Sequence, residues 1–168
     1  MLLITADIHG STEALKDIVD IAASLKVEQV LIAGDLCPQE GSTFASLLSR
    51  LPGLVLVRGN SDSSYQYAQA RIHLPPLVRT LIYQGLPITL THGHVDVPYT
   101  VGGIVISGHT HMPSLKEDWN GTLWLNPGSP SRPRSSSGAT YALIDPEGVG
   151  IYRLRNHSPF LNHRFKSS

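Results

Sequence analysis

The chain has 168 residues, of which 41% are hydrophobic and 15% charged, a composition that indicates a globular protein and argues against a disordered one. Its formal net charge is zero, which argues against an extended nucleic-acid face but leaves room for a small nucleotide substrate. The single cysteine, Cys37, excludes an intrachain disulfide framework. No apolar run approaches membrane-spanning length, and the first residues lack the pattern of a signal peptide. We therefore expect a cytoplasmic protein without a membrane partner.

The first half of the chain predicts alternating strands and helices. Buried strands are indicated by three apolar runs, at 2–6, 30–33 and 54–57. Ser11 or Thr12 can cap a first helix. The apolar face of this helix is predicted by residues at helical spacing, namely Leu15, Ile18, Val19, Ala22 and Leu25. A shorter helix is expected at 43–50. Three strands joined through two helices form a βαβαβ unit, which requires a parallel sheet.

The second half predicts mostly β structure. A strand is expected at 104–107. Three strand pairs surround turn sequences, at 78–83 and 87–90, at 115–119 and 122–125, and at 140–144 and 149–154. We expect an α/β fold in which two sheets pack face to face with helices outside. Without a linker between the halves, the prediction is one domain over 1–155, followed by a partly ordered tail over 156–168.

Five of the predicted strands end in Asp, Asn or His. The motifs are Asp7-Ile8-His9, Gly34-Asp35, Gly59-Asn60, His92-Gly93-His94 and Gly108-His109-Thr110-His111. One such residue alone would more often be a turn or core polar residue. The repeated pattern indicates a site, because sites in open α/β sheets lie at strand ends. We expect the segment with the last two histidines to be extended, so that its side chains point in different directions.

Seven side chains in these motifs are carboxylate, amide or imidazole ligands, namely Asp7, His9, Asp35, Asn60, His92, His109 and His111. This mixture without thiolates suits Mn, Fe, Zn, Ni or Co better than a structural zinc site. Seven ligands exceed what one metal needs, so we expect two metals that share a carboxylate. Asp35 is the expected bridge, because its strand should lie between the other two. Two metals roughly 3.5–4 Å apart form a clamp for in-line displacement at phosphorus.

Together with Asn126-Pro127-Gly128-Ser129, these ordered motifs resemble the calcineurin-like metallophosphoesterases. The chain is most similar to the small single-domain bacterial and archaeal phosphodiesterases of that superfamily, and the similarity extends from residue 1 to about 154. The resemblance implies a four-layer αββα sandwich of two mixed β-sheets flanked by helices. It also implies a phosphodiesterase that acts on a small phosphodiester through two divalent metal ions, with Mn favoured and Ni, Zn, Fe or Co as alternatives.

The resemblance assigns the ligands to two metals. Asp7, His9, Asp35 and His111 would hold the first; Asp35, Asn60, His92 and His109 would hold the second. A hydroxide bridging both would attack the phosphorus, which makes Asp35 and Asn60 catalytic candidates. His94 is a third candidate, either orienting the phosphate or donating a proton, with a plain hydrogen bond in the loop as the equal alternative. The 126–129 motif is expected to shape the site without direct chemistry.

The sequence departs from the family pattern at two places. Ser61 occupies a position where the wider superfamily often has histidine, and a serine hydroxyl is a poor general acid at neutral pH. This favours diesters over alkyl monoesters. The connection between His94 and His109 leaves little room for a helix, which favours an open site or one completed by a partner copy in a homo-oligomer.

Several alternatives stay open at this stage. The protein could be a phosphomonoesterase of the same fold, or a metal-free interaction scaffold like the retromer subunit within the resemblance. Asp62 is expected to cap the next helix or to orient Asn60. Arg132 and Arg134 either meet a phosphate or lie in a solvated loop, and the latter is favoured. Cys37 is expected to be buried rather than reactive.

Overall fold

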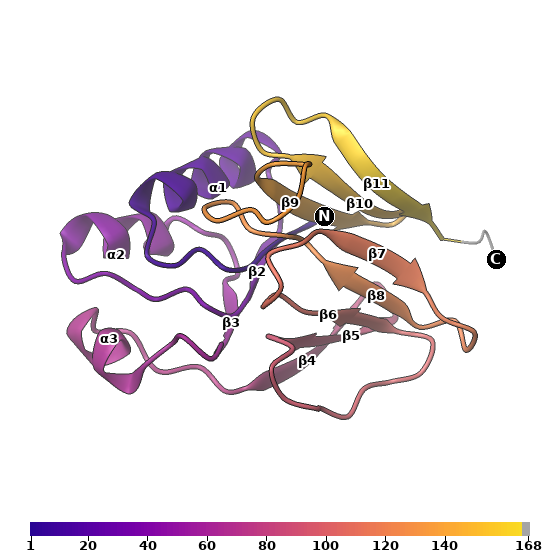
Figure 1. The fold of residues 1–168 in the computed structure, drawn as a ribbon, viewed down its shortest axis with the longest axis horizontal. Helices are drawn as coiled ribbons and strands as arrows, with labels where there is room; N and C mark the ends of the chain where they lie inside the picture. Colours follow the sequence, from indigo (N-terminus) through magenta and orange to yellow (C-terminus); the bar gives the residue numbers. More distant parts are fainter. Residues whose placement is uncertain (166–168) are drawn as a thin grey trace.

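A computed structural model describes residues 1–165, and this part of the chain forms two packed β-sheets with three helices (Figure 1). The six-stranded sheet has the order β11-β10-β9-β1-β2-β3, from β1 (Leu2–Thr5), β2 (Gln29–Ala33), β3 (Val55–Val57), β9 (Thr140–Asp145), β10 (Gly148–Arg153) and β11 (Pro159–Arg164). The five-stranded sheet has the order β4-β5-β6-β8-β7, from β4 (Val78–Tyr83), β5 (Leu86–Thr91), β6 (Ile104–Ile106), β7 (Ser114–Glu117) and β8 (Leu123–Asn126). The helices are α1 (Thr12–Ser24), α2 (Ser42–Ser49) and α3 (Ser64–Gln69).

Both sheets are mixed, as expected. β1 runs parallel to β2 and antiparallel to β9, while β6 runs parallel to both β5 and β8. β2 lies between β1 and β3, which is the central position predicted for the strand that leads to Asp35. The three predicted hairpins are present as the pairs β4–β5, β7–β8 and β9–β10.

Helix α1 begins where the sequence predicts. The Ser11 hydroxyl accepts a 3.1 Å hydrogen bond from the Ala14 N–H, which satisfies one of the free donors at the helix N-terminus. Leu15, Ile18 and neighbouring residues bury the predicted apolar face. Leu25, predicted to share that face, is instead 40% exposed, because the helix ends at Ser24 and Leu25 is its C-cap.

Two hydrophobic cores hold the layers together. Successive residues of β1 point to opposite faces of the sheet, so Leu3 joins the core beneath the helices and Leu2 joins the core between the sheets. All three helices contribute to the first core, with Tyr67 coming from α3. The connection from β5 to β6 contains no helix, as predicted from its length. Consequently the helices within residues 1–165 cover the six-stranded sheet, and the helical layer expected over the five-stranded sheet is not seen there.

The expected partly ordered tail is wrong for residues 159–164. These residues form β11, which pairs antiparallel with β10 and makes the edge of the six-stranded sheet. Phe160 packs against the core between the sheets and helps to hold the strand. The predicted domain boundary at 155 therefore falls before a strand of the same sheet. Residues 166–168 lie outside the described part of the chain. Within residues 1–165, no helix has both the length and the apolar character needed to cross a membrane.

Candidate metal centre

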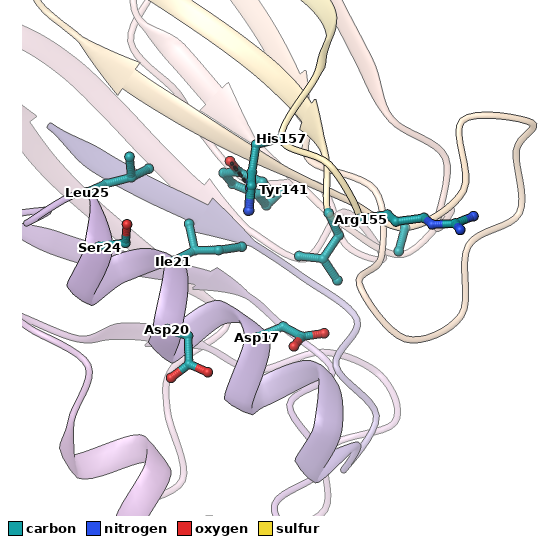
Figure 2. Close-up of a pocket in the computed structure, with 10 residues that line it drawn as sticks. Asp17, Asp20, Ile21, Ser24, Leu25, Tyr141, Arg155 and His157 are labelled. Atoms are coloured by element: carbon teal, nitrogen blue, oxygen red, sulfur yellow. Dashed lines mark hydrogen bonds between the residues drawn. The ribbon is translucent and has the colours of Figure 1, made fainter.

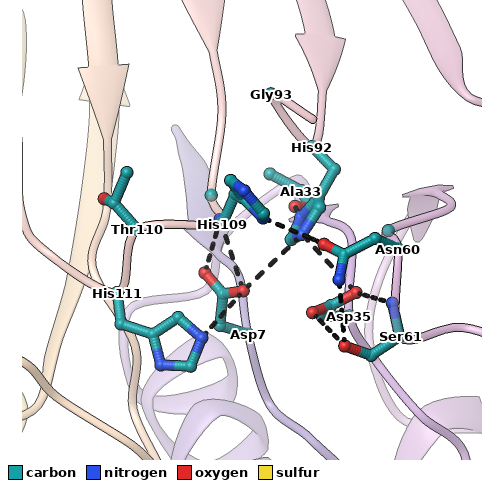
Figure 3. A network of polar contacts seen from close by, with 12 residues as sticks. Asp7, Ala33, Asp35, Asn60, Ser61, His92, Gly93, His109, Thr110 and His111 are labelled. Atoms are coloured by element: carbon teal, nitrogen blue, oxygen red, sulfur yellow. Dashed lines mark hydrogen bonds and ion pairs between the residues drawn. The ribbon is translucent and has the colours of Figure 1, made fainter. Parts of the chain in front are cut away.

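The seven predicted ligand side chains meet where the two sheets present their strand ends. Figure 3 shows these side chains apart from His9. The loops that carry them follow β1, β2 and β3 in one sheet and β5 and β6 in the other. Parallel neighbouring strands end at the same edge, which is why motifs distant in sequence come together. Most of these side chains are buried, but Asn60 and His109 are exposed and open the centre to solvent.

The backbone around these ligands is left-handed. Positive φ angles of 47–70° occur at Asp7, His9, Asp35, Cys37, His109 and His111. For residues with a Cβ this conformation costs on the order of 1–2 kcal/mol each. The extended segment expected at the last two histidines is therefore wrong, because each of them turns the chain. Their side chains still point to different places, His109 toward Asn60 and His111 toward His9.

Two glycines of the motifs are required by close packing against the carboxylates. A Cβ at Gly59 would collide with the Asp35 carboxylate. A Cβ at Gly108 would lie 2.8 Å from Asp7 Oδ2 and 2.7 Å from Ala6 Cβ. The glycines in the Gly-Asn and Gly-His motifs thus allow neighbouring loops to approach the ligands.

The first group of ligand atoms comes from Asp7, His9 and His111, which lie within 4.8 Å of one another. His111 Nδ1 donates a 2.8 Å hydrogen bond to the Arg132 carbonyl. In a neutral ring this leaves His111 Nε2 as an acceptor. That atom lies 3.1 Å from His9 Nε2 and 3.5 Å from Asp7 Oδ1. The arrangement concentrates lone pairs in one place, as a bound cation requires.

The second group of ligand atoms is built in the same way. His92 Nδ1 donates a 2.8 Å hydrogen bond to the Ala33 carbonyl, so Nε2 of the neutral ring is an acceptor. This Nε2 lies 3.1 Å from Asn60 Oδ1, which can also only accept. Asn60 Oδ1 is in turn 2.9 Å from His109 Nδ1. Two acceptors that face each other repel unless a ring proton or a metal ion lies between them, so this donor set fits a metal ion.

Asp35 lies between the two groups. Its Oδ2 is 3.6 Å from His9 Nε2, and its Oδ1 is 3.5 Å from His92 Nε2. Asp7 also faces both groups, because its Oδ1 is 3.9 Å from the same two nitrogens. The compact ligand sets within residues 1–165 in fact share Asp7, namely Asp7 with His9 and His111, and Asp7 with Asp35 and His92. Geometry therefore allows either carboxylate to be shared, and the bridge at Asp35 stays a prediction.

The charges in the centre show the same need for a cation. Burial raises the pKa of Asp7 to about 7, and the nearby charge of Asp35 adds to this effect. Burial also acts to raise the pKa of Asp35, but hydrogen bonds from His92 and Ser61 outweigh it and hold that pKa well below its usual range. Burial lowers the pKa of His92, yet its contacts with Asp35, Ala33 and Asp7 overcome this and raise it. Without a metal, the histidine has to supply the positive charge that the carboxylates require.

The expectation that Asp62 caps the next helix is wrong, whereas its bond to the N–H of Gly59, next to Asn60, leaves a part in orienting Asn60 as a prediction. Ser63 caps α3 instead, with its hydroxyl accepting a 3.2 Å hydrogen bond from the Gln66 N–H. The buried Asp62 carboxylate accepts three backbone N–H bonds, from Asp35 at 2.9 Å and from Cys37 and Gly59 at 2.8 Å. It therefore joins the loop after β2 to the loop after β3. The sequence did not predict that Asp62 joins these loops, because an aspartate just before a helix is also the usual pattern of an N-cap.

The Asn126–Ser129 motif supports two of the ligand loops, as expected of a loop that shapes the site. Asn126 Nδ2 donates a 2.7 Å hydrogen bond to the Gly108 carbonyl. The Ser129 hydroxyl donates a 2.8 Å bond to the Asp7 carbonyl. The first bond supports the loop after β6, and the second joins the mostly β half of the chain to the loop after β1.

His94 lies beside the second group without entering it. Its ring centroid is 5.4 Å from that of His92 and 6.4 Å from that of His109. Its Nδ1 is buried and, within the described residues, has no hydrogen-bond partner. The loop hydrogen bond considered as an alternative for His94 is therefore not seen at this atom. Cys37 is buried as expected, at 7% exposure, and burial raises the pKa of its thiol to about 12.

A separate cavity of about 650 Å³ lies between α1 and the segment that follows β10 (Figure 2). It contains none of the predicted ligands. Its lining includes Ile21, Leu25, Tyr141 and Leu154, with Asp17 on its rim. The chemistry predicted from the sequence belongs to the metal centre, so we place the candidate site there and not in this separate cavity.

The comparison that decides the family is the match of residues 1–148 to the calcineurin-like phosphoesterase superfamily domain. The chain belongs to this superfamily. Among its relatives in the superfamily, phosphodiesterase YfcE of Escherichia coli K12 is 27% identical over 175 residues, covering 94% of each chain. A probable metallophosphoesterase of Methanothermobacter thermautotrophicus is 31% identical over 145 residues, covering 79% of this chain and 78% of the other. The protein is a metal-dependent phosphoesterase of this superfamily, as the sequence predicted.

Solved structures agree with the fold. The YfcE phosphoesterase from E. coli superposes with a TM-score of 0.84 at 23% identity and covers 98% of this chain and 99% of that one. Vacuolar protein sorting 29 from Cryptosporidium parvum superposes with a TM-score of 0.71 at 22% identity and covers 99% of this chain and 97% of that one. The metallophosphoesterase sandwich is therefore confirmed for this chain.

Proposed function

We propose that the protein is a phosphodiesterase that uses two divalent metal ions. The observation that carries the proposal is the position of Asp35, whose two carboxylate oxygens face His9 and His92 on opposite sides. Asp7, His9, Asp35 and His111 would hold the first ion, and Asp35, Asn60, His92 and His109 the second. When bound, two such ions supply a hydroxide nucleophile near neutral pH and neutralise the charge that develops on the phosphoryl group.

The chain's own residues fix the geometry for this chemistry. The hydrogen bonds from His92 to Ala33 and from His111 to Arg132 set the orientation and tautomer of both rings. The exposed side of the second group, at Asn60, leaves room for a substrate to approach. We assign the unpartnered Nδ1 of His94 to the orientation of the phosphate or to proton donation.

Diesters suit this site better than alkyl monoesters. A monoester of a poor leaving group needs an acid beside it, and the position after Asn60 offers only a serine hydroxyl. That hydroxyl is already donated to Asp35. The name of the E. coli relative, a phosphodiesterase, supports the same choice. Manganese is the metal we propose, with Ni, Zn, Fe and Co as alternatives that suit the same ligands.

The test is a metal-stripped protein reloaded with Mn and assayed on bis(p-nitrophenyl) phosphate. We expect hydrolysis to require metal, metal analysis to give two ions per chain, and Asp35→Asn to lose nearly all activity. Asp17→Asn, an exposed aspartate on α1, is the matched control and should keep full activity. A reloaded protein that is inert, or an Asp35→Asn variant as active as the wild type, would contradict the mechanism. Failure to take up Mn, Ni or Zn would instead favour an interaction scaffold on this fold.

A further inference from the structure

The loop between β8 and β9 is fastened to the first ligand group through its backbone. The Arg132 carbonyl accepts the 2.8 Å hydrogen bond from His111 Nδ1, and the Arg134 N–H donates a 3.2 Å bond to the His111 carbonyl. The Arg132 N–H is held by the Ser129 hydroxyl at 2.9 Å, and that hydroxyl also bonds the Asp7 carbonyl. Both arginines are thus positioned relative to the metal centre.

The side chains of Arg132 and Arg134 are exposed and have no anionic partner. Within residues 1–165, no carboxylate lies within 4 Å of either guanidinium, and neither guanidinium donates a hydrogen bond to another residue. The segment 131–138 itself contains no acidic residue. Pro133 lies between the two arginines and fixes its own φ, which limits how far they can separate.

The backbone places these arginines beside the first ligand group. The Arg132 carbonyl is bonded to the His111 ring, and the Arg134 N–H is bonded to the His111 carbonyl. The Nε2 of the same His111 ring lies 3.1 Å from His9 Nε2. Two unpaired cations therefore border the side of the centre formed by His9 and His111.

The charge balance favours a substrate with more than one anionic group. Two divalent ions would outweigh the negative charges of Asp7, Asp35 and a hydroxide by one, so the centre alone could neutralise a phosphodiester, which has a single negative charge. Two further guanidinium groups would then lack a counter-charge. Arginine binds phosphate through paired N–H donors, and this geometry suits it better than lysine.

We propose that Arg132 and Arg134 form a binding subsite for a second phosphate group. The preferred substrates are phosphodiesters with an additional phosphate. This phosphate lies on the ester group that extends past His9 and His111. This inference rests on the proposed phosphodiesterase function, and it turns the predicted solvated loop into a determinant of specificity.

Two matched pairs of probes test the subsite. Binding to the Mn-loaded protein is measured by calorimetry for thymidine 3′,5′-bisphosphate and thymidine 5′-monophosphate. Hydrolysis is measured for the p-nitrophenyl ester of thymidine 5′-phosphate with and without a 3′-phosphate. We expect the extra phosphate to strengthen binding and to raise kcat/KM by about tenfold, as charge-assisted hydrogen bonds to a phosphate allow.

The variants separate the subsite from general electrostatics. In the double variant Arg132→Ala with Arg134→Ala, the preference for the extra phosphate should fall to near unity. The double lysine variant keeps the charge but loses the paired donors, so it should retain only part of the preference. Arg155→Ala, an exposed arginine after β10 that lines the separate cavity, should keep the full preference.

Each result has a distinct meaning. Equal binding of the two nucleotides by the wild type, or a preference that survives the double alanine change, would overturn the subsite. If both esters are hydrolysed at equal rates, the subsite is wrong and the phosphodiesterase function stands. If neither ester is hydrolysed but the bisphosphate binds tenfold more tightly through the arginines, the subsite stands and the proposed reaction fails.

Discussion

The Ser61 hydroxyl donates a 2.8 Å hydrogen bond to Asp35 Oδ2, while the Ser61 backbone N–H donates a 2.9 Å bond to Oδ1 of the same carboxylate. Both oxygens of the proposed bridging ligand are therefore oriented by one residue. The position where the wider superfamily often has histidine serves here to hold a proposed ligand. Ser61 therefore has a role in orienting Asp35. The sequence alone indicated only that Ser61 is a poor proton donor.

Replacing Ser61 with alanine should weaken metal binding. The change removes the hydroxyl bond to Asp35 but keeps the backbone bond, so we expect roughly a tenfold loss of Mn affinity, at the lower end of what outer ligand contacts contribute. Calorimetric titration of the stripped protein measures this loss. Ser24→Ala, at the exposed end of α1, is the control and should bind Mn like the wild type. Unchanged affinity in the Ser61 variant would show that the hydroxyl bond contributes little.

Replacing Ser61 with histidine should shift the balance of substrates toward monoesters. An imidazole beside Asn60 can assist a leaving group, whereas a serine hydroxyl cannot. The ratio of rates on p-nitrophenyl phosphate and bis(p-nitrophenyl) phosphate measures the shift. The Ser61→Ala variant is the matched reference, because it loses the same hydrogen bond without gaining an acid. If the two variants show the same ratio, the interpretation of this position is wrong.

Replacing Asp62 with asparagine should destabilise the fold. The buried carboxylate accepts three backbone N–H bonds, and the amide group of asparagine offers only one accepting oxygen. At least one buried N–H loses its partner, which costs about 2 kcal/mol or more of the free energy of unfolding. Urea unfolding of the metal-free protein measures this cost. The exposed Asp17→Asn change should alter the same free energy by less than about 0.5 kcal/mol.

Metal binding should weaken below neutral pH. Burial raises the pKa of Asp7 to about 7, so the folded metal-free protein holds a proton there that the unfolded chain releases near pH 4. The stability contributed by this proton is complete below about pH 4 and is lost as the pH rises through 7. A metal has to displace the proton, so Mn affinity should be about tenfold lower at pH 6 than at pH 8. Calorimetry in buffers of different ionisation enthalpy should detect proton release at pH 6. Equal affinity at both pH values would contradict the raised pKa.

The strands and the clustering of the candidate ligand side chains could be predicted because their signals are local. The apolar runs before Asp7, Asp35 and Asn60 have the length and composition of buried strands, and the polar residues mark their ends. Parallel pairing then brings those ends to one edge of the sheet. Local signals also predicted the central position of β2 and a cap for α1 at Ser11 or Thr12, of which Ser11 caps the helix.

The features that the sequence did not reveal depend on distant partners. Asp62 takes its role from backbone donors on another loop, and no local pattern reports where those donors lie. β11 has an exposed and weakly apolar sequence, and it forms a strand because β10 offers an open edge. The left-handed turns at His109 and His111 arise where β6 ends among crowded ligand loops. The sequence Gly108-His109-Thr110-His111 contains no local signal that predicts them.

The left-handed backbone at the ligand positions also limits how such a protein can evolve. Aspartate, asparagine and histidine tolerate this conformation better than most residues, and glycine adopts it without strain, whereas β-branched residues are strongly disfavoured. A descendant that gave up metal binding would lose stability if Val or Ile replaced Asp7 or His109. Descendants that lost catalysis yet kept this fold should therefore carry Asn, Gly or the original residue at these positions. If such a protein kept the ligand residues, the reason would be the left-handed backbone as well as metal binding.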